Sequence, residues 1–83
     1  MTLRLRYFAS IREALGSGEP FDAAEGMTVA QLRDALIARG GAHAAALGRG
    51  RAVRTALDQV LCDEATLVPH DAEIAFFPPV TGG

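Results

Sequence analysis

Residues 27–41 read MTVAQLRDALIARGG, and this stretch decides the fold class. Thr28 and Gln31 have the spacing of a capping box, in which each side chain bonds to the backbone N–H of the other residue at the start of a helix. Gly40-Gly41 then ends the helix. Its apolar stripe consists of Val29, Leu32, Ala35 and Leu36, and its outward residues are predicted to be Gln31, Arg33 and Asp34. An amphipathic helix over residues 28–39 must cover one face of a sheet.

Segments with a two-residue repeat lie on both sides of this helix. Residues 2–8 alternate in this way, which is typical of a strand with one buried face. One face would carry Leu3, Leu5 and Tyr7, and the other Thr2, Arg4, Arg6 and Phe8. Further strands are expected over residues 19–24 (an edge strand, because of Pro20), within 52–61 with the register left open, and over 73–77; short helices are expected over residues 9–15 and 42–47.

This order of elements predicts the α+β class. The chain has 83 residues and a mass of 8.7 kDa, which leaves no room for a second core. We expect one domain over residues 1–77, followed by an extended flexible tail over residues 78–83 that ends in Gly-Gly. The helix would cover one face of the sheet and leave the other to water or to a partner.

Composition excludes several classes of protein. With 49% apolar and 22% charged residues the chain is an ordinary globular domain, and no apolar run approaches the ~18 residues of a membrane span. The net charge of −2 disfavours nucleic acid as a partner. All eight basic residues are arginine, which excludes lysine chemistry on this chain. A single cysteine and an alternating, charged beginning favour the cytoplasm over a secreted protein.

No motif for a metal, a cofactor or a catalytic nucleophile is present. His43, His70 and Cys62 lack the close spacing of zinc ligands, and Cys62 follows two apolar residues, as an inert thiol would. Gly48 and Gly50 match a phosphate-binding loop only weakly. The neighbouring arginines at 49, 51 and 54 are interpreted as a solvated patch. We therefore expect neither a bound cofactor nor a bound metal.

The end of the chain points to chemistry of another kind. Residues 78–83 read PPVTGG, and the two prolines favour a stiff, extended exit that can span about 18–20 Å. Gly82 and Gly83 lack Cβ atoms, so they can enter a narrow channel. The terminal carboxylate is ionised at neutral pH and can attack the α-phosphate of a nucleotide. The tail is thus suited to being activated as a substrate, although a frayed end would also fit this composition.

Residues 76–83, FFPPVTGG, resemble the C-terminus of the ubiquitin-like sulfur carriers, the family of the small subunit of molybdopterin synthase. Two other segments are similar to that family: Phe8-Ala9 with Ile11-Arg12-Glu13 and Gly16, and Thr28-Val29 with Leu32. The chain departs from the common family pattern at residues 70–73, HDAE in place of Asp-Gly-Asp-Glu, and at residues 56–58, ALD in place of Ala-Val-Asn.

The resemblance implies a β-grasp (ubiquitin-like) fold, a mixed sheet with one main helix across one face. It also implies a cycle on Gly83. A ubiquitin-activating-type enzyme uses ATP to adenylate the glycine, a persulfide donor converts it to a thiocarboxylate, and the sulfur passes to cyclic pyranopterin monophosphate. The catalytic side chains would belong to the large synthase subunit, in a heterotetramer. The residues that enter the large subunit would be Pro78, Pro79, Val80, Thr81 and Gly82.

Strand alternation predicts where the partner binds. Ile74 and Phe76 should face the helix, and Phe77 should face outward. If the first and last strands are neighbours, as the resemblance implies, the partner surface consists of Phe8, Phe77, Arg4 and Arg6. Two alternatives stay open at this point: a sulfur carrier of another pathway (thiazole formation for thiamine, or tRNA thiolation), and a ubiquitin-like adaptor without a sulfur cycle.

Overall fold

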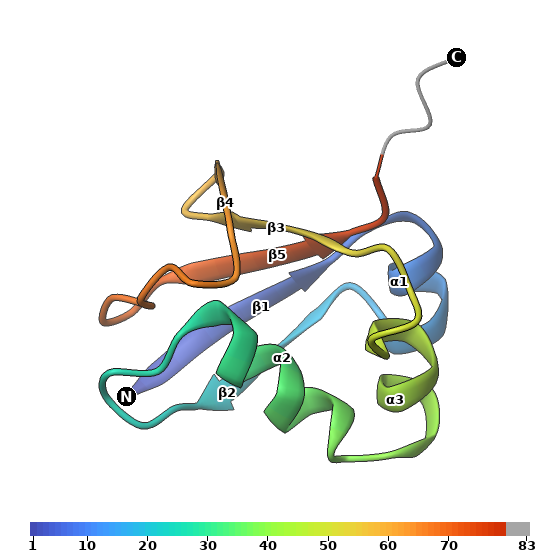
Figure 1. The fold of residues 1–83 in the computed structure, drawn as a ribbon, viewed down its shortest axis with the longest axis horizontal. Coiled ribbons are helices and arrows are strands. Elements are labelled where there is room, and N and C mark those ends of the chain that lie inside the picture. The colour runs from blue at the N-terminus through green and yellow to red at the C-terminus, as the bar shows by residue number, and fades with distance from the viewer. Residues whose placement is uncertain (80–83) are drawn as a thin grey trace.

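Strands from opposite ends of the chain form the centre of the fold. In this computed structural model, which describes residues 1–79, β1 (Thr2–Tyr7) pairs in parallel with β5 (Glu73–Phe77). Leu5 lies opposite Ile74 and Tyr7 lies opposite Phe76, so the inward residues of both strands share one face. The two strands therefore end at the same end of the molecule, from which the chain continues toward the C-terminus (Figure 1).

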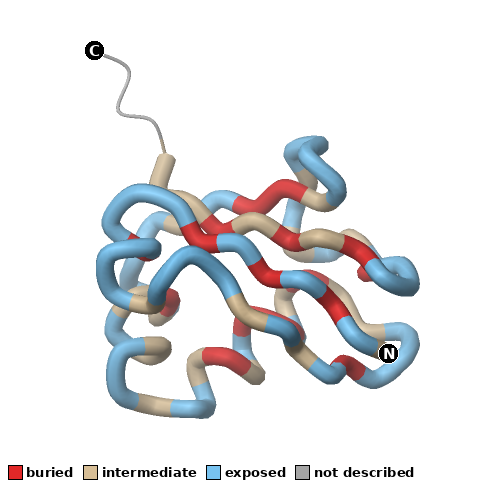
Figure 2. The backbone as a smooth tube through the Cα atoms, turned by 180° about the vertical axis from the view of Figure 1, so that it is seen from behind, coloured by how far each residue is buried: buried red, intermediate tan, exposed pale blue. Residues whose placement is uncertain are grey.

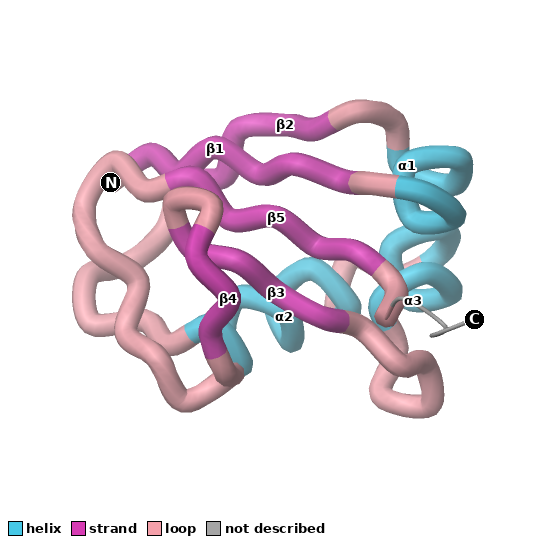
Figure 3. The backbone as a smooth tube through the Cα atoms, turned by 90° about the horizontal axis from the view of Figure 1, so that it is seen from above, coloured by secondary structure: helices cyan, strands magenta, loops and turns pink. Residues whose placement is uncertain are grey.

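Three further strands complete the sheet within the described residues. They are β2 (Gly18–Asp22), β3 (Arg54–Leu57) and β4 (Val60–Cys62), each antiparallel to its neighbours, in the order β2-β1-β5-β3-β4 (Figure 3). The prediction of an edge strand around Pro20 is confirmed. The first residue of that strand is Gly18. A Cβ at this position would lie 2.2 Å from the carbonyl oxygen of Leu5, so a side chain would force the backbone to shift.

The helices lie on one face and at one end of the sheet (Figure 1, Figure 3). They are α1 (Ala9–Leu15), α2 (Val29–Ile37) and α3 (Gly41–Leu47). The predicted capping box is present at α2: the Gln31 backbone N donates to Thr28 Oγ1 at 3.2 Å, and the Thr28 backbone N donates to Gln31 Oε1 at 2.9 Å. Such a cap contributes about 1 kcal/mol to the stability of a helix.

The core lies between α2 and the sheet. Val29, Leu32 and Leu36 on α2 and Ile74 and Phe76 on β5 are fully buried. Buried residues alternate with exposed ones along β1 and with half-buried ones along β5 (Figure 2), as the two-residue repeat predicts. Burying one such side chain stabilises a fold by about 1.5–3 kcal/mol. Because Leu5 and Tyr7 of β1 belong to the same core, α2 packs on strands from both ends of the chain.

Arg33 was predicted to face outward, and this is wrong. Its side chain is buried, with a relative exposure of 4%. The guanidinium donates to the carbonyl oxygens of Leu47 (2.7 Å), Gly48 (2.9 Å) and Arg51 (3.1 Å), and to Glu64 Oε2 (2.8 Å). A buried arginine is tolerated when its donors are bonded in this way, because the bonds offset the loss of water.

The register of β3 and β4, left open by the sequence, is set by a two-residue turn. Asp58 and Gln59 both have positive φ, 47° and 71°, which is the geometry of a tight hairpin turn without glycine. Leu57 therefore lies opposite Val60, and Ala56 lies opposite Leu61. The boundary between a domain over residues 1–77 and a tail over residues 78–83 stays a prediction, since residues 80–83 lie outside the described part.

Candidate functional site

The face of the sheet that the helices leave open carries the predicted partner surface. Arg4 and Arg6 on β1 are exposed on this face, and Phe77 at the end of β5 is half-buried. Phe8 follows β1 and is 38% exposed. The structure thus brings the four predicted residues to one face, as strand alternation requires. Their role in binding stays a prediction.

Arg6 joins the charged and aromatic parts of this surface. Its guanidinium carbon lies 5.5 Å from the centre of the Phe8 ring, and its Nη1 donates to Glu73 Oε1 at 3.2 Å. Exposed ion pairs and cation–π contacts each contribute at most about 1 kcal/mol. Their effect here is to keep the arginine side chain close to the Phe8 ring and to Glu73.

Leu61 also belongs to this face, and the sequence analysis missed it. It is 69% exposed and lies opposite Ala56, whose other neighbour across the sheet is Ala75. A shallow groove of about 300 Å³ lies at the end of the strands, lined by Arg54, Leu61, Phe77 and Pro79. The register of the β3–β4 hairpin was the missing information: with it, Leu61 falls on the face of Phe77. Leu61 therefore adds an exposed apolar side chain to the predicted partner surface.

The chain leaves the sheet at this groove. Arg54, the first residue of β3, lies opposite Phe77, the last residue of β5, so this pair ends the ladder between the two strands. Pro78 and Pro79 follow and are half-buried, and neither has an N–H with which to continue the ladder. The predictions for Val80, Thr81, Gly82 and Gly83 concern residues outside the described part of the chain. The structure therefore shows that the chain leaves the sheet directly beside the predicted partner surface.

A polar cluster lies on the opposite, covered side of β1 and β2. Glu19 accepts a hydrogen bond from Tyr7 Oη at 2.8 Å, lies 2.8 Å from His43 Nε2, and pairs with Arg39. Partial burial disfavours the carboxylate, but the hydrogen bonds of His43, Arg39 and Tyr7 outweigh it and lower the pKa of Glu19 to about 2. Burial, and then the bond to Glu19, raises the pKa of Tyr7 well above its usual range. These contacts link β1 and β2 to Arg39, between α2 and α3, and to His43 on α3.

The described residues contain no group of three or more histidine, cysteine or acidic side chains that could hold a metal ion. Cys62 is half-buried, and its Sγ lies 3.6 Å from Thr55 Oγ1. Within residues 1–79, the hydrogen-bond partners of this thiol are the hydroxyl and the carbonyl oxygen of Thr55. The expectation that the chain binds no cofactor is not tested by these contacts.

Comparison with known proteins assigns the chain to a family. The model of the ThiS family matches residues 5–83. The chain belongs to this family. As a member of the ThiS family, it is similar to an Escherichia coli (strain K12) protein named molybdopterin synthase sulfur carrier subunit, with 36% identity over 81 residues, which are 98% of this chain and 99% of that protein. The predicted family is therefore confirmed.

Two solved structures show the same β-grasp fold as this ThiS-family chain. SAMP1 from Haloferax volcanii has a TM-score of 0.77 and 25% identity, with full coverage of both chains. A chain of the protein–protein complex of subunits 1 and 2 of molybdopterin-converting factor from Helicobacter pylori 26695 has a TM-score of 0.70 and 25% identity, again with full coverage. The predicted α+β, β-grasp class is confirmed. None of the helices within residues 1–79 has the length and apolar character needed to cross a membrane.

Proposed function

We propose that this chain is the sulfur carrier subunit of a molybdopterin synthase. The observation that carries the proposal is the 36% identity, over nearly the whole of both chains, to a protein with that name. The FFPPVTGG ending and the open face beside its root agree with this function. In this account the folded domain serves to present a reactive terminus, and it acts in the cytoplasm without a bound cofactor.

Gly83 is the residue on which the cycle would run. Its carboxylate attacks the α-phosphate of ATP in an activating enzyme, and pyrophosphate leaves. The acyl adenylate is then attacked by sulfur from a persulfide donor, AMP leaves, and reduction of the remaining S–S bond by a thiol frees the thiocarboxylate. Delivery of the sulfur to cyclic pyranopterin monophosphate and attack by water return the carboxylate.

The partner of the open face would be the large synthase subunit. Phe8 and Phe77 would supply its apolar contacts, and Arg4 and Arg6 its polar edge. Residues 78–82 would enter the large subunit as an extended segment, and Gly82 would pass a channel too narrow for a Cβ. The large subunit would supply the catalytic side chains, in an assembly of two small and two large subunits.

Reconstitution tests this function. Thiocarboxylated protein is mixed with the large subunit and with cyclic pyranopterin monophosphate, and the dithiolene product is measured. We expect product with the intact chain and none with the chain that lacks Gly83 or carries a C-terminal tag, although both should melt like the intact protein. Gly82→Ala should reduce the rate and leave the melting temperature unchanged.

Two results would count against the proposal. Product formation by the tagged chain would show that the terminal carboxylate is not the carrier. Failure of the fully thiocarboxylated chain to yield product, when the same large subunit works with an established carrier, would favour another thiolation pathway or an adaptor.

A further inference from the structure

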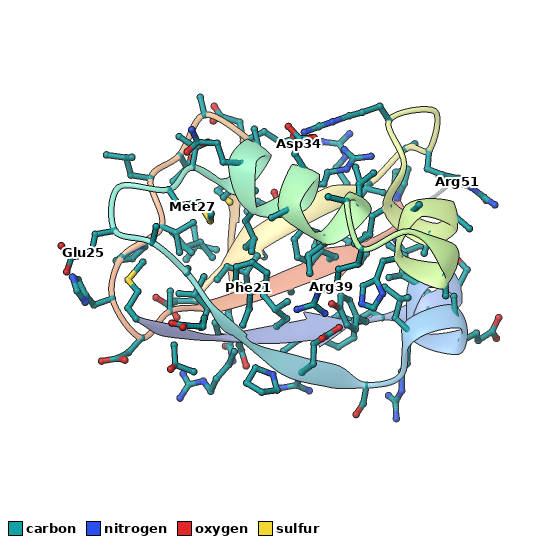
Figure 4. All side chains as sticks on the ribbon, turned by 90° about the horizontal axis from the view of Figure 1, so that it is seen from below. Phe21, Glu25, Met27, Asp34, Arg39 and Arg51 are labelled. Atoms are coloured by element: carbon teal, nitrogen blue, oxygen red, sulfur yellow. The ribbon has the colours of Figure 1, made fainter. Side chains whose placement is uncertain are left out.

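The two ends of the molecule differ in charge. Side chains of acidic residues gather at the end where β1 and β5 begin, and they include Asp22, Glu25, Asp58, Asp71 and Glu73. At the other end, the described chain leaves β5. In Figure 4, Glu25 lies at one end of the molecule and Arg51 at the other, beside α3. The carboxylates are thus unevenly distributed on a chain whose net charge is −2.

Most arginines elsewhere are neutralised by a carboxylate. Arg6 pairs with Glu73, Arg33 with Glu64, Arg39 with Glu19, and Arg49 with both Asp34 and Glu64. Four exposed arginines have no ion pair with any carboxylate of residues 1–79: Arg4, Arg12, Arg51 and Arg54. Arg4, on β1, lies opposite Glu73, toward the acidic end, and Arg12 lies on α1. Arg51 and Arg54 lie three residues apart, on the segment that leads into β3 and at the first residue of that strand. We call these two residues the basic rim.

The basic rim adjoins the point where the chain leaves the sheet. Arg54 lies opposite Phe77 and lines the groove together with Leu61 and Pro79. Arg51 lines a hollow against Ser10, Ile11 and Ala14 of α1, and α1 starts directly after Phe8, whose backbone N donates to the carbonyl oxygen of Phe76 at 3.1 Å. Arg54 therefore borders the point where the chain leaves β5, and Arg51 lies beside α1, which follows β1 at the same end of the sheet.

The loop that carries Arg51 is held in place from within. Buried Arg33 bonds to the carbonyl oxygens of Leu47, Gly48 and Arg51, and the Arg51 backbone N closes a turn on Gly48 at 2.8 Å. The backbone of residue 51 is thus tied at both its N–H and its carbonyl, while the side chain stays exposed. A charge on a fixed backbone loses less entropy on binding than one on a free loop.

We propose that the basic rim contacts an acidic protein surface that surrounds the entrance for the tail on its partner. This inference rests on the proposed function and adds to it the chemistry of the partner surface: carboxylates around the channel. A nucleic acid is disfavoured, because the acidic end and the negative net charge repel phosphates. The rim lies at the solvent-exposed edge of the interface, where opposite charges mainly raise the association rate and orient the encounter.

Association kinetics with the large subunit test the basic rim. The association rate constant is measured for the intact chain and for Arg51→Gln, Arg54→Gln and the double variant, at low and at high ionic strength. Gln59→Glu is the matched control: it changes the net charge by the same −1 as Arg54→Gln and lies on the same hairpin, at the acidic end. We expect the double variant to associate about three- to tenfold more slowly at low salt, with a flatter salt dependence, and the control to change less than twofold.

Several outcomes would overturn the inference. One is an equal effect of Arg54→Gln and Gln59→Glu, which would reflect net charge alone. Another is an unchanged rate and salt dependence in the double variant. A third is binding of a single-stranded oligonucleotide that is tighter than binding of the large subunit and is lost in the double variant. If the intact chain does not bind the large subunit at all, the proposed function fails, and the inference fails with it; if the intact chain binds and forms product but the rim variants behave like it, the inference alone fails.

Discussion

The two faces of the sheet have opposite tasks, although the same strands build both. On β5, Ile74 and Phe76 are fully buried under α2, whereas Ala75 and Phe77 lie half-buried on the open face. On β1, Leu5 and Tyr7 are buried and Arg4 and Arg6 are exposed. Adjacent phenylalanines, 76 and 77, therefore contribute to different free energies: one to folding, and the other, on our account, to binding.

This difference shows how a chain of 83 residues can keep an apolar surface open without losing its core. The helix stripe and one face of the sheet bury enough apolar side chains to fold the domain. The second face is free to carry exposed apolar residues for a partner. Each prediction below tests whether one side chain belongs to the face to which we assign it.

Phe76→Ala should have the largest effect, on the covered face. Phe76 has no exposed surface, and its ring centre lies 6.2 Å from that of Tyr7. Removing a buried ring leaves a cavity and should cost about 3–5 kcal/mol of unfolding free energy. Urea unfolding measures this loss. A variant that unfolds like the intact chain would contradict the assignment of Phe76 to the core.

Phe77→Ala should show the opposite pattern. Because its ring lies on the open face, the change should weaken binding of the large subunit by about 1–3 kcal/mol, as for an interface anchor. Its cost to the isolated domain should be small. Titration calorimetry beside a thermal melt separates the two quantities. If the variant keeps its affinity for the large subunit but has a lowered melting temperature, Phe77 stabilises the fold and does not belong to the interface.

Glu19→Gln tests the polar cluster on the covered side. The folded-state pKa of about 2 lies below the ordinary value of 4.5, so the charged carboxylate stabilises the fold above about pH 4.5, and this contribution is lost as the pH falls toward 2. We expect the variant to be less stable at pH 7 by about 1–2 kcal/mol, allowing for solvent screening. Its unfolding free energy should also depend less on pH between 5 and 2. Parallel pH profiles for both proteins would contradict this account.

Leu61→Ala and Val60→Ala form a matched pair with a smaller effect. The two residues adjoin on β4, are 69% and 68% exposed, and point to opposite sides of the hairpin. Leu61→Ala should weaken binding of the large subunit by about 1 kcal/mol, whereas Val60→Ala should leave it unchanged. Equal losses, or a loss with Val60 alone, would show that the face of Phe77 does not define the contact.

Local patterns predicted most of the fold, because short-range spacing decides helix starts and strand faces. The capping box of Thr28 and Gln31 and the alternation along β1 are examples. Arg33 was missed because its partners, Leu47, Gly48 and Glu64, lie 14 or more residues away in sequence. Leu61 was missed because the turn at Asp58 and Gln59 contains no glycine that would mark the register. Both residues depend on contacts that only the folded chain forms.

The mass of the chain after activation tests the central claim most directly. The protein is incubated with ATP, the activating enzyme and a persulfide donor, and its intact mass and C-terminal peptide are measured. We expect a gain of about 16 Da at Gly83, from the replacement of one carboxylate oxygen by sulfur, and no gain in a variant without Gly83. A gain of about 32 Da on Cys62, the mark of a persulfide, or an unchanged mass beside active enzyme, would contradict the account.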